Sequence, residues 1–251
     1  MKHIYAAETV DELLSYQSFV TRSLPKLAEF ISYIQKQYRV VKLPQAIIWT
    51  SADTATEILS DIPIPAYTDD KRTVITPDVE AWRQIYLEQL NGMEEENDNV
   101  RKVWTYYSTA LSNRNILQIL GHELVHHSEL FLSDFDCENE SGIWFEEGMA
   151  EYISRKFFLT NDEFNSETQV NQILVDLLRS RCGNHSLEDF GAETYLGDYG
   201  SIFFEYWRSF LAVKQIVDAH GGDVLAVFNS YHRWYNTNRT QPLTAWFGVS
   251  V

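Results

Sequence analysis

One short motif constrains this chain more than any other feature. Residues 121–126 read G-H-E-L-V-H, which places His122 and His126 four residues apart. Residues at this spacing on an α-helix lie one above the other on the same face, so both imidazoles can point at one ion. Glu123, one step round the helix, would lie beside that ion, where it can take a proton from water. The motif therefore predicts a metal site built on one helix.

The surrounding sequence supplies the helix and a third ligand. Residues 115–120 bring apolar side chains into the motif at helical spacing, and Asn113 is the expected N-cap. A catalytic zinc takes three protein ligands and keeps one position open for water. In the second amphipathic helix, predicted over 143–158, Glu147 is the natural third ligand. Its neighbour Glu146 is the alternative, because only one of the two carboxylates can face inward.

The second segment also carries a family pattern. Residues 144–152 read W-F-E-E-G-M-A-E-Y, and together with the first motif they resemble the gluzincin zinc metallopeptidases. That group includes the thermolysin-like enzymes and the aminopeptidase N family, in which a W-x-x-E-G-x-A segment supplies the glutamate ligand. The resemblance implies one Zn²⁺ ion held by His122, His126 and Glu147, in a zincin-like fold. The longer metzincin motif is excluded, because it requires Gly and His where this chain has Glu129 and Leu132.

An acid one turn after the glutamate ligand has its own role in thermolysin-like enzymes. Glu151 lies four residues after Glu147 and so shares its helix face. A ligating histidine usually donates its second N–H to a carboxylate or a carbonyl, and Glu151 is the expected acceptor. The alternative is a solvent-exposed helix pair between Glu151 and Arg155.

The resemblance further implies a donor that stabilises the oxyanion of the reaction. The stretch around Tyr199 resembles the segment that carries this tyrosine in the aminopeptidase N family, although Gly200 follows it directly and shifts the register. We therefore rank Tyr199 first, Tyr195 second, and His232 and His220 after them.

Composition narrows the class of partner. The formal net charge of −16 disfavours nucleic acid and anionic membranes as partners. No apolar run reaches the length of a membrane span, and the first residues lack a signal-peptide pattern, so a cytoplasmic location is expected. Cys137 and Cys182 are the two cysteines, which argues against a disulfide framework and a thiolate zinc site.

The pattern along the chain predicts an α+β fold with a small N-terminal sheet and a mainly helical lobe. We expect one domain over 1–251, with its helical and sheet part at about 1–112 and the motif-bearing helical part at about 113–251. The strand signals are 45–50, 62–67 and 72–76, the last two flanking a hairpin loop. Before them, 8–39 predicts two helical stretches that open on a Thr9–Glu12 capping box and break near Ser23 and Pro25.

These features predict a zinc-dependent metallopeptidase that hydrolyses a peptide or protein substrate. By the family resemblance, an edge strand within 45–76 would bind the substrate backbone. Two alternatives stay open: a non-catalytic zinc-binding regulatory or interaction protein, and a zinc hydrolase of a non-peptide substrate. Neither the cleavage specificity nor the oligomeric state follows from the sequence.

Overall fold

The structure is a computed structural model that describes residues 1–60, 63–94, 96–132 and 142–249. The chain divides into two compact units. Unit 1 comprises Met1–Glu129 and Ile153–Phe164, and unit 2 comprises Leu130–Tyr152 and Asn165–Val251. The predicted α+β class is confirmed, because a small N-terminal sheet is followed by helices. The single domain over 1–251 stays a prediction, and Cys137 lies outside the described residues.

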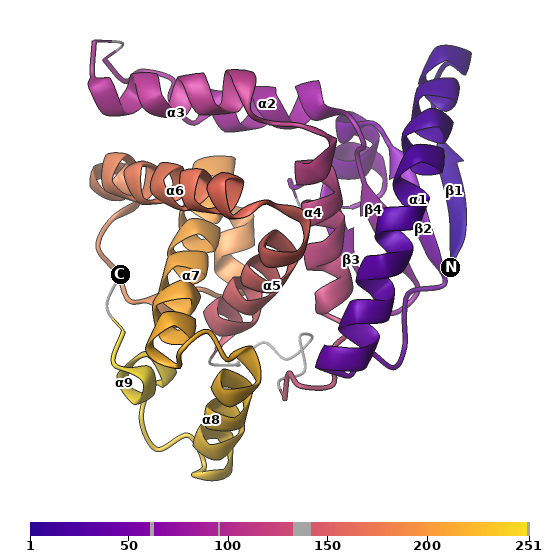
Figure 1. The fold of residues 1–251 in the computed structure, drawn as a ribbon. Coiled ribbons are helices and arrows are strands. Elements are labelled where there is room, and N and C mark those ends of the chain that lie inside the picture. The colour runs from indigo at the N-terminus through magenta and orange to yellow at the C-terminus, as the bar shows by residue number, and fades with distance from the viewer. Residues whose placement is uncertain (61–62, 95, 133–141, 250–251) are drawn as a thin grey trace. The chain divides into compact units, whose positions relative to one another are not determined.

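The elements are labelled as in Figure 1. In chain order they are β1 (Lys2–Ala6), α1 (Val10–Tyr38), β2 (Ala46–Thr50), η1 (Thr54–Ile58), β3 (Ala66–Thr68), β4 (Arg72–Ile75), α2 (Val79–Glu88), α3 (Asp98–Thr109), α4 (Asn113–Val125), α5 (Ile143–Phe158), α6 (Asn161–Cys182), η2 (Leu187–Asp189), η3 (Ala192–Leu196), α7 (Tyr199–Ala219), α8 (Val224–Asn236) and α9 (Leu243–Phe247). Among the helices that the structure describes, none combines the length and the apolar character needed to cross a membrane.

The sheet lies in unit 1 and has the strand order β1-β2-β4-β3. β1, β2 and β4 run parallel, and β3 pairs with β4 in the antiparallel direction. The predicted strand at 45–50 and the antiparallel pairing of the two hairpin strands are confirmed. The first hairpin strand was predicted at 62–67 but begins only at Ala66, and it includes Thr68, which was predicted as part of the loop. β3 is the edge strand within that region. β1 was not predicted, because its five residues are only partly buried and show weak alternation.

Helix α1 corrects a sequence prediction, because it runs without a break through Pro25. The capping box is as predicted: the Thr9 hydroxyl accepts from the Glu12 amide, and the Glu12 carboxylate accepts from the Thr9 amide. A proline inside a helix costs about 3 kcal/mol through a lost backbone bond and a ring clash. One buried face of α1 offsets this cost, with buried side chains at helical spacing: Tyr16, Phe19, Val20, Ser23, Leu27, Phe30 and Ile34.

Helix α4 is the centre of unit 1 and carries the sequence motif. It packs against α1, β3 and β4 (Figure 1), and every residue from Asn115 to Val125 is buried. Its N-cap is Ser112 rather than the predicted Asn113. The backbone of Ser112 is extended, its hydroxyl accepts from the Arg114 amide, and the Asn115 side chain accepts from the Ser112 amide at 3.0 Å. Ser112 occupies the N-cap position because the Asn115 side chain completes a reciprocal capping box with it.

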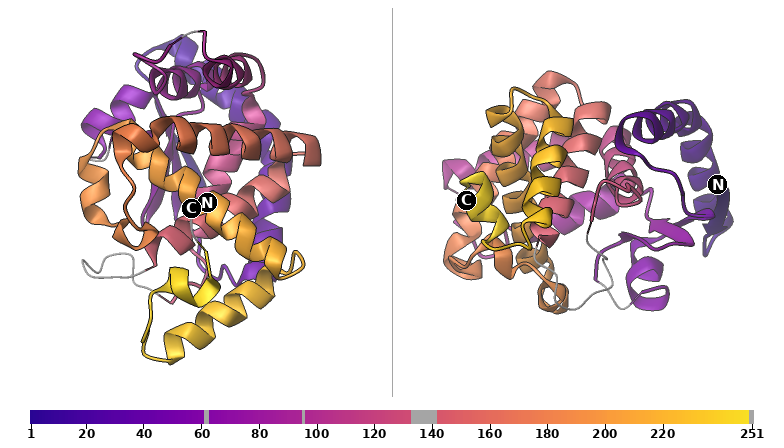
Figure 2. Two further views of the ribbon diagram at one scale, coloured as in Figure 1. Left: turned by 90° about the vertical axis from the view of Figure 1, so that its left-hand side faces the viewer. Right: turned by 90° about the horizontal axis from the view of Figure 1, so that it is seen from below.

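Unit 2 is helical in its described part. Figure 2 shows α7, α8 and α9, in orange to yellow, next to one another from two further sides, and contacts join α7 to α8 and α8 to α9. α5 approaches α7 closely at Gly148, where an added Cβ would collide with the Ser209 carbonyl and lie 2.6 Å from Val213 Cγ2. The glycine that follows Glu147 is therefore required by helix packing.

Candidate metal centre

The two motif histidines meet at the end of α4. The helix ends at Val125, but the C-cap residue His126 keeps right-handed helical dihedral angles of φ −56° and ψ −22°. The four-residue spacing is therefore preserved, and the Nε2 atoms of His122 and His126 lie 3.0 Å apart. The rings stand edge to face, with centroids 4.8 Å apart. His122 is buried and His126 is half-buried.

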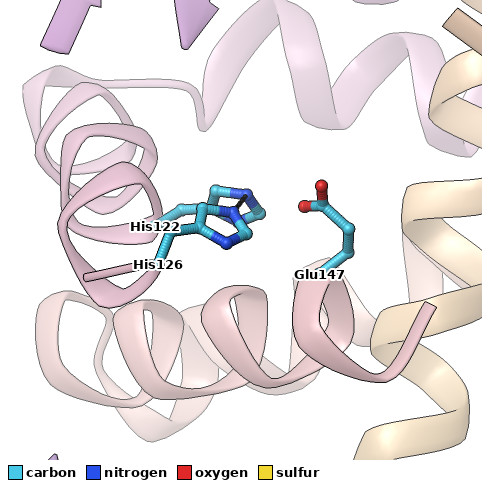
Figure 3. Close-up of side chains that lie close together, drawn as sticks. All are labelled: His122, His126 and Glu147. Carbon is cyan, nitrogen blue, oxygen red and sulfur yellow. Dashed lines mark hydrogen bonds between the residues drawn. The ribbon is translucent and has the colours of Figure 1, made fainter. Parts of the chain in front are cut away.

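Glu147 on α5 completes a group that could hold one metal ion. Each of His122, His126 and Glu147 offers one ligand atom, and these atoms all lie within 4.8 Å of one another. Figure 3 shows the three side chains together. Among the described residues, the group includes Glu147 and not its neighbour Glu146.

The donor types and the spacing of the two histidine nitrogens suit a metal ion. Ligand atoms about 2.0–2.2 Å from a tetrahedral zinc ion lie about 3.3–3.6 Å from one another. The two Nε2 atoms are 3.0 Å apart, slightly closer than that range, and the Glu147 ligand atom lies within 4.8 Å of both histidine ligand atoms. Two imidazoles and one carboxylate are also the donor set of one class of catalytic zinc site, which keeps its fourth position open.

The two other acids of the predicted site lie on the same two helices. Glu123 follows His122 on α4 and is 8% exposed. Glu151 is half-buried on α5, one turn after Glu147. The general-base role of Glu123 and the histidine-orienting role of Glu151 stay predictions.

One of the ranked tyrosines, Tyr195, and one that was not predicted, Tyr206, contact the candidate ligand Glu147. The Tyr195 hydroxyl donates to Glu147 Oε1 at 2.9 Å, and the Tyr206 hydroxyl reaches the same oxygen at 3.3 Å. Tyr199, ranked first from the sequence, is the first residue of α7, and its ring stacks on Phe203. Tyr206 was not predicted, because a tyrosine in the apolar pattern of α7 carries no signal that separates it from a packing residue.

The two histidines ranked as further oxyanion donors each place one ring nitrogen within hydrogen-bond distance of a backbone carbonyl oxygen. His232 Nε2 lies 2.7 Å from the Leu130 oxygen, and His220 Nδ1 lies 2.7 Å from the Ile216 oxygen. Their predicted roles, like that of Tyr199, stay predictions.

His127 links the end of the motif helix to the edge of the sheet, and the sequence analysis missed it. Its Nε2 lies 2.9 Å from the Thr68 hydroxyl on β3, which in turn lies 2.9 Å from the Thr73 hydroxyl on β4. Burial lowers the pKa of His127, and the electrostatic effect of the neighbouring His126 ring acts in the same direction. A neutral His127 can therefore serve as a hydrogen-bonding partner of Thr68.

Comparison with known proteins adds no relative: no family model, no curated protein and no solved structure matches this chain. The resemblance to gluzincins therefore stays a prediction that depends on two short segments and on the three converging side chains.

Proposed function

We propose that this chain is a zinc-dependent metallopeptidase of the gluzincin type, with the ion held by His122, His126 and Glu147. The observation that carries the proposal is the convergence of these three ligand atoms within 4.8 Å, from the two helices on which the sequence motifs lie. A buried Glu123 beside one of the ligands supports catalysis over a purely structural metal, because a structural site does not need that carboxylate.

When bound, zinc would acidify a water molecule and polarise the carbonyl of a peptide bond. Glu123 would accept the proton released from that water and pass it to the leaving amine. The low exposure of Glu123 supports this role, because few bulk water molecules can compete for the proton. His127 and Thr68 would hold the end of α4 against β3 during the reaction.

The oxyanion donor stays as predicted from the sequence, with Tyr199 ranked first. The Tyr195 hydroxyl already donates to Glu147 Oε1 at 2.9 Å, and a tyrosine hydroxyl has one proton to give. An oxyanion donor must direct its proton at the reacting oxygen, so the contact with Glu147 counts against Tyr195 in this role.

The sheet edge favours a peptide over a small non-peptide substrate. Among the strands that the structure describes, β3 has one neighbour, β4, so one side of its backbone is not paired with another described strand. An extended peptide can add to such an edge by main-chain hydrogen bonds. The bond between Thr68 on β3 and His127 connects this edge to the helix that carries the two histidine ligands.

The test measures metal content and peptide cleavage in the same preparations. We expect the wild type to carry one zinc per chain and to cleave a peptide library. Glu123→Gln should keep the zinc but lose activity by about 10²–10⁴-fold, the contribution of a general base. Glu129→Gln is the matched control, because it makes the same chemical change at an exposed glutamate.

The other outcomes separate the alternatives. Zinc in the wild type without any cleavage would contradict the peptidase and favour a regulatory zinc protein or a hydrolase of another substrate. A wild type that binds no zinc would contradict the site itself. Full activity in Glu123→Gln would contradict the assigned mechanism.

A further inference from the structure

Two tyrosine hydroxyls converge on one oxygen of Glu147. Besides the contacts at 2.9 and 3.3 Å to Oε1, the hydroxyls of Tyr195 and Tyr206 lie 3.2 Å from each other. A tyrosine hydroxyl has one proton to donate. Tyr195, at the shorter distance, gives its proton to the carboxylate, and Tyr206 then divides its proton between Glu147 and the Tyr195 oxygen.

One buried ring supports both tyrosines. The Phe190 ring centroid lies 5.8 Å from that of Tyr195 and 5.7 Å from that of Tyr206, and Phe190 is 2% exposed. Such aromatic contacts fix ring orientation as well as burying apolar surface. The two hydroxyls are therefore held by a packed aromatic group and not by exposed side chains alone.

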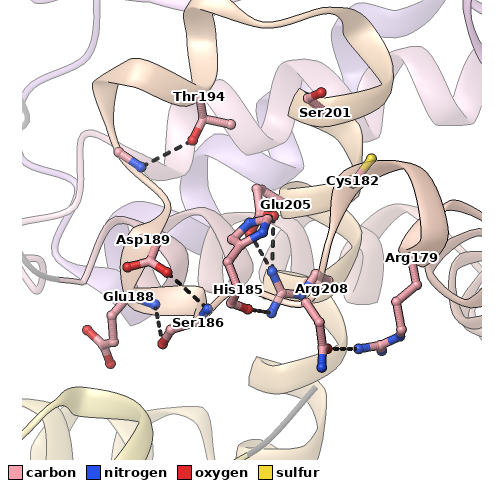
Figure 4. Close-up of polar contacts among 12 residues, drawn as sticks. Arg179, Cys182, His185, Ser186, Glu188, Asp189, Thr194, Ser201, Glu205 and Arg208 are labelled. Carbon is pink, nitrogen blue, oxygen red and sulfur yellow. Dashed lines mark hydrogen bonds and ion pairs between the residues drawn. The ribbon is translucent and has the colours of Figure 1, made fainter.

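The segment that carries Tyr195 is attached to α7 at its beginning. Arg208 donates to the two Glu205 carboxylate oxygens at 3.0 and 3.1 Å and to the His185 carbonyl at 2.7 Å (Figure 4). The His185 ring closes the network, with Nε2 2.7 Å from Glu205 Oε1. Arg208 and Glu205 are each 2% exposed, so this attachment is buried.

The same segment is also fixed at its end and within its turns. Asp198 accepts from the Ser201 amide at 2.8 Å and forms an ion pair with Arg181 of α6. Two turns lie between these points, and each is closed by a side chain that accepts from a backbone amide. The Asp189 carboxylate accepts from the Ser186 amide, and the Thr194 hydroxyl accepts from the Gly191 amide. Hydrogen bonds and ion pairs thus fix the chain both before and after Tyr195.

We propose that Tyr195 and Tyr206 are positioning residues for the metal ligand Glu147. By holding Oε1, they fix the rotation of the carboxylate and reserve Oε2 for the ion. The inference rests on the metal site of the proposed function, but it does not depend on which reaction the metal serves. Partners of this kind, which bind a ligand rather than the metal, typically contribute about 10–100-fold to metal affinity.

The test compares three tyrosine-to-phenylalanine variants, each of which keeps the ring and removes one oxygen. Zinc affinity is measured by competition with a chelator, and ligand geometry by the visible spectrum of the Co²⁺-loaded protein. We expect Tyr195→Phe to weaken zinc binding by about 10–100-fold and to change the cobalt spectrum. Tyr206→Phe should have a smaller effect in the same direction, because its contact is longer. Tyr235→Phe, on α8, is the matched control and should leave both measurements unchanged.

Each result supports or overturns the proposal. Wild-type zinc affinity and an unchanged cobalt spectrum in Tyr195→Phe would overturn it. A loss of affinity that is as large in Tyr235→Phe would also overturn it, because the effect would then not be specific to Glu147. If the wild type binds zinc but cleaves no peptide, the proposed function fails while the positioning role is still tested by the same titrations. If it binds no zinc, both fail.

Discussion

The histidine pair of α4 and the tyrosine-bearing segment of unit 2 obtain their geometry in opposite ways. His122 and His126 need one turn of helix, and the spacing along the chain alone brings their Nε2 atoms to 3.0 Å. Tyr195 reaches Glu147 from 48 residues away in the chain, through short 3₁₀ turns that would not hold their shape alone. A local rule sets the first arrangement, and a buried network sets the second.

This difference determines which substitutions would disturb each arrangement. A substitution elsewhere on α4 leaves the histidine spacing in place as long as the helix forms. The Tyr195 hydroxyl depends instead on Arg208, Glu205 and Phe190, none of which belongs to the metal-ligand group. Substitutions in the two regions should therefore differ in their effect on stability.

The largest effect is expected at the buried anchor. Arg208→Ala leaves the Glu205 carboxylate buried without its guanidinium partner, and loss of one member of a buried pair costs about 3–5 kcal/mol. Arg181→Ala is the control, because it breaks an ion pair with Asp198 whose side chains are 45% and 56% exposed. Such exposed pairs contribute about 0–1 kcal/mol. Urea unfolding of both variants measures the difference, and equal losses would show that the segment does not depend on the buried network.

An intermediate effect is expected at Gly121 and Gly148, the two glycines next to the candidate ligands His122 and Glu147. In Gly148→Ala the new Cβ meets a backbone carbonyl of α7, which cannot rotate away, and overpacking of this kind costs about 1–3 kcal/mol. In Gly121→Ala it lies 2.7 Å from the edge of the Phe158 ring, which can shift. Thermal unfolding should therefore show a larger loss of stability for Gly148→Ala. The reverse order would mean that α4 is the more tightly packed of the two ligand helices.

The smallest effect is expected at the N-cap of α7. The bond from the Ser201 amide, helped by Arg181, lowers the pKa of Asp198. Since the folded-state pKa lies below the unfolded value of about 3.9, the stabilisation is complete above that value and is lost as pH falls through the folded-state pKa. Asp198→Asn keeps the cap acceptor and removes the charge, so it should cost about 0.5 kcal/mol at neutral pH.

The check is a series of thermal melts of the wild type and Asp198→Asn from pH 7 to pH 3. The gap between the two melting temperatures should narrow on acidification below about pH 4. A difference in melting temperature that is constant across this range would show that the charge of Asp198 does not stabilise the fold.

The sequence was informative wherever the determining contacts are local. The capping box of Thr9 and Glu12, the hairpin of β3 and β4, and the histidine pair each depend on residues a few positions apart. The break predicted at Pro25 was wrong, because the penalty is local while the compensating burial comes from the sheet and α4. Tyr206 escaped prediction for the same reason, since its contact with Glu147 depends on the packing of α7 and not on any motif.

Phe190 has a consequence for how such a site can be altered. It carries no polar atom in its side chain, yet its ring supports both tyrosines that bind Glu147. If Glu147 holds an ion as proposed, a change of shape at this position would act on that ligand through two phenol rings, while the candidate ligands themselves stayed chemically intact. Natural variation or laboratory selection could then change the affinity for the ion in small steps, at a position that sequence motifs would never mark as functional.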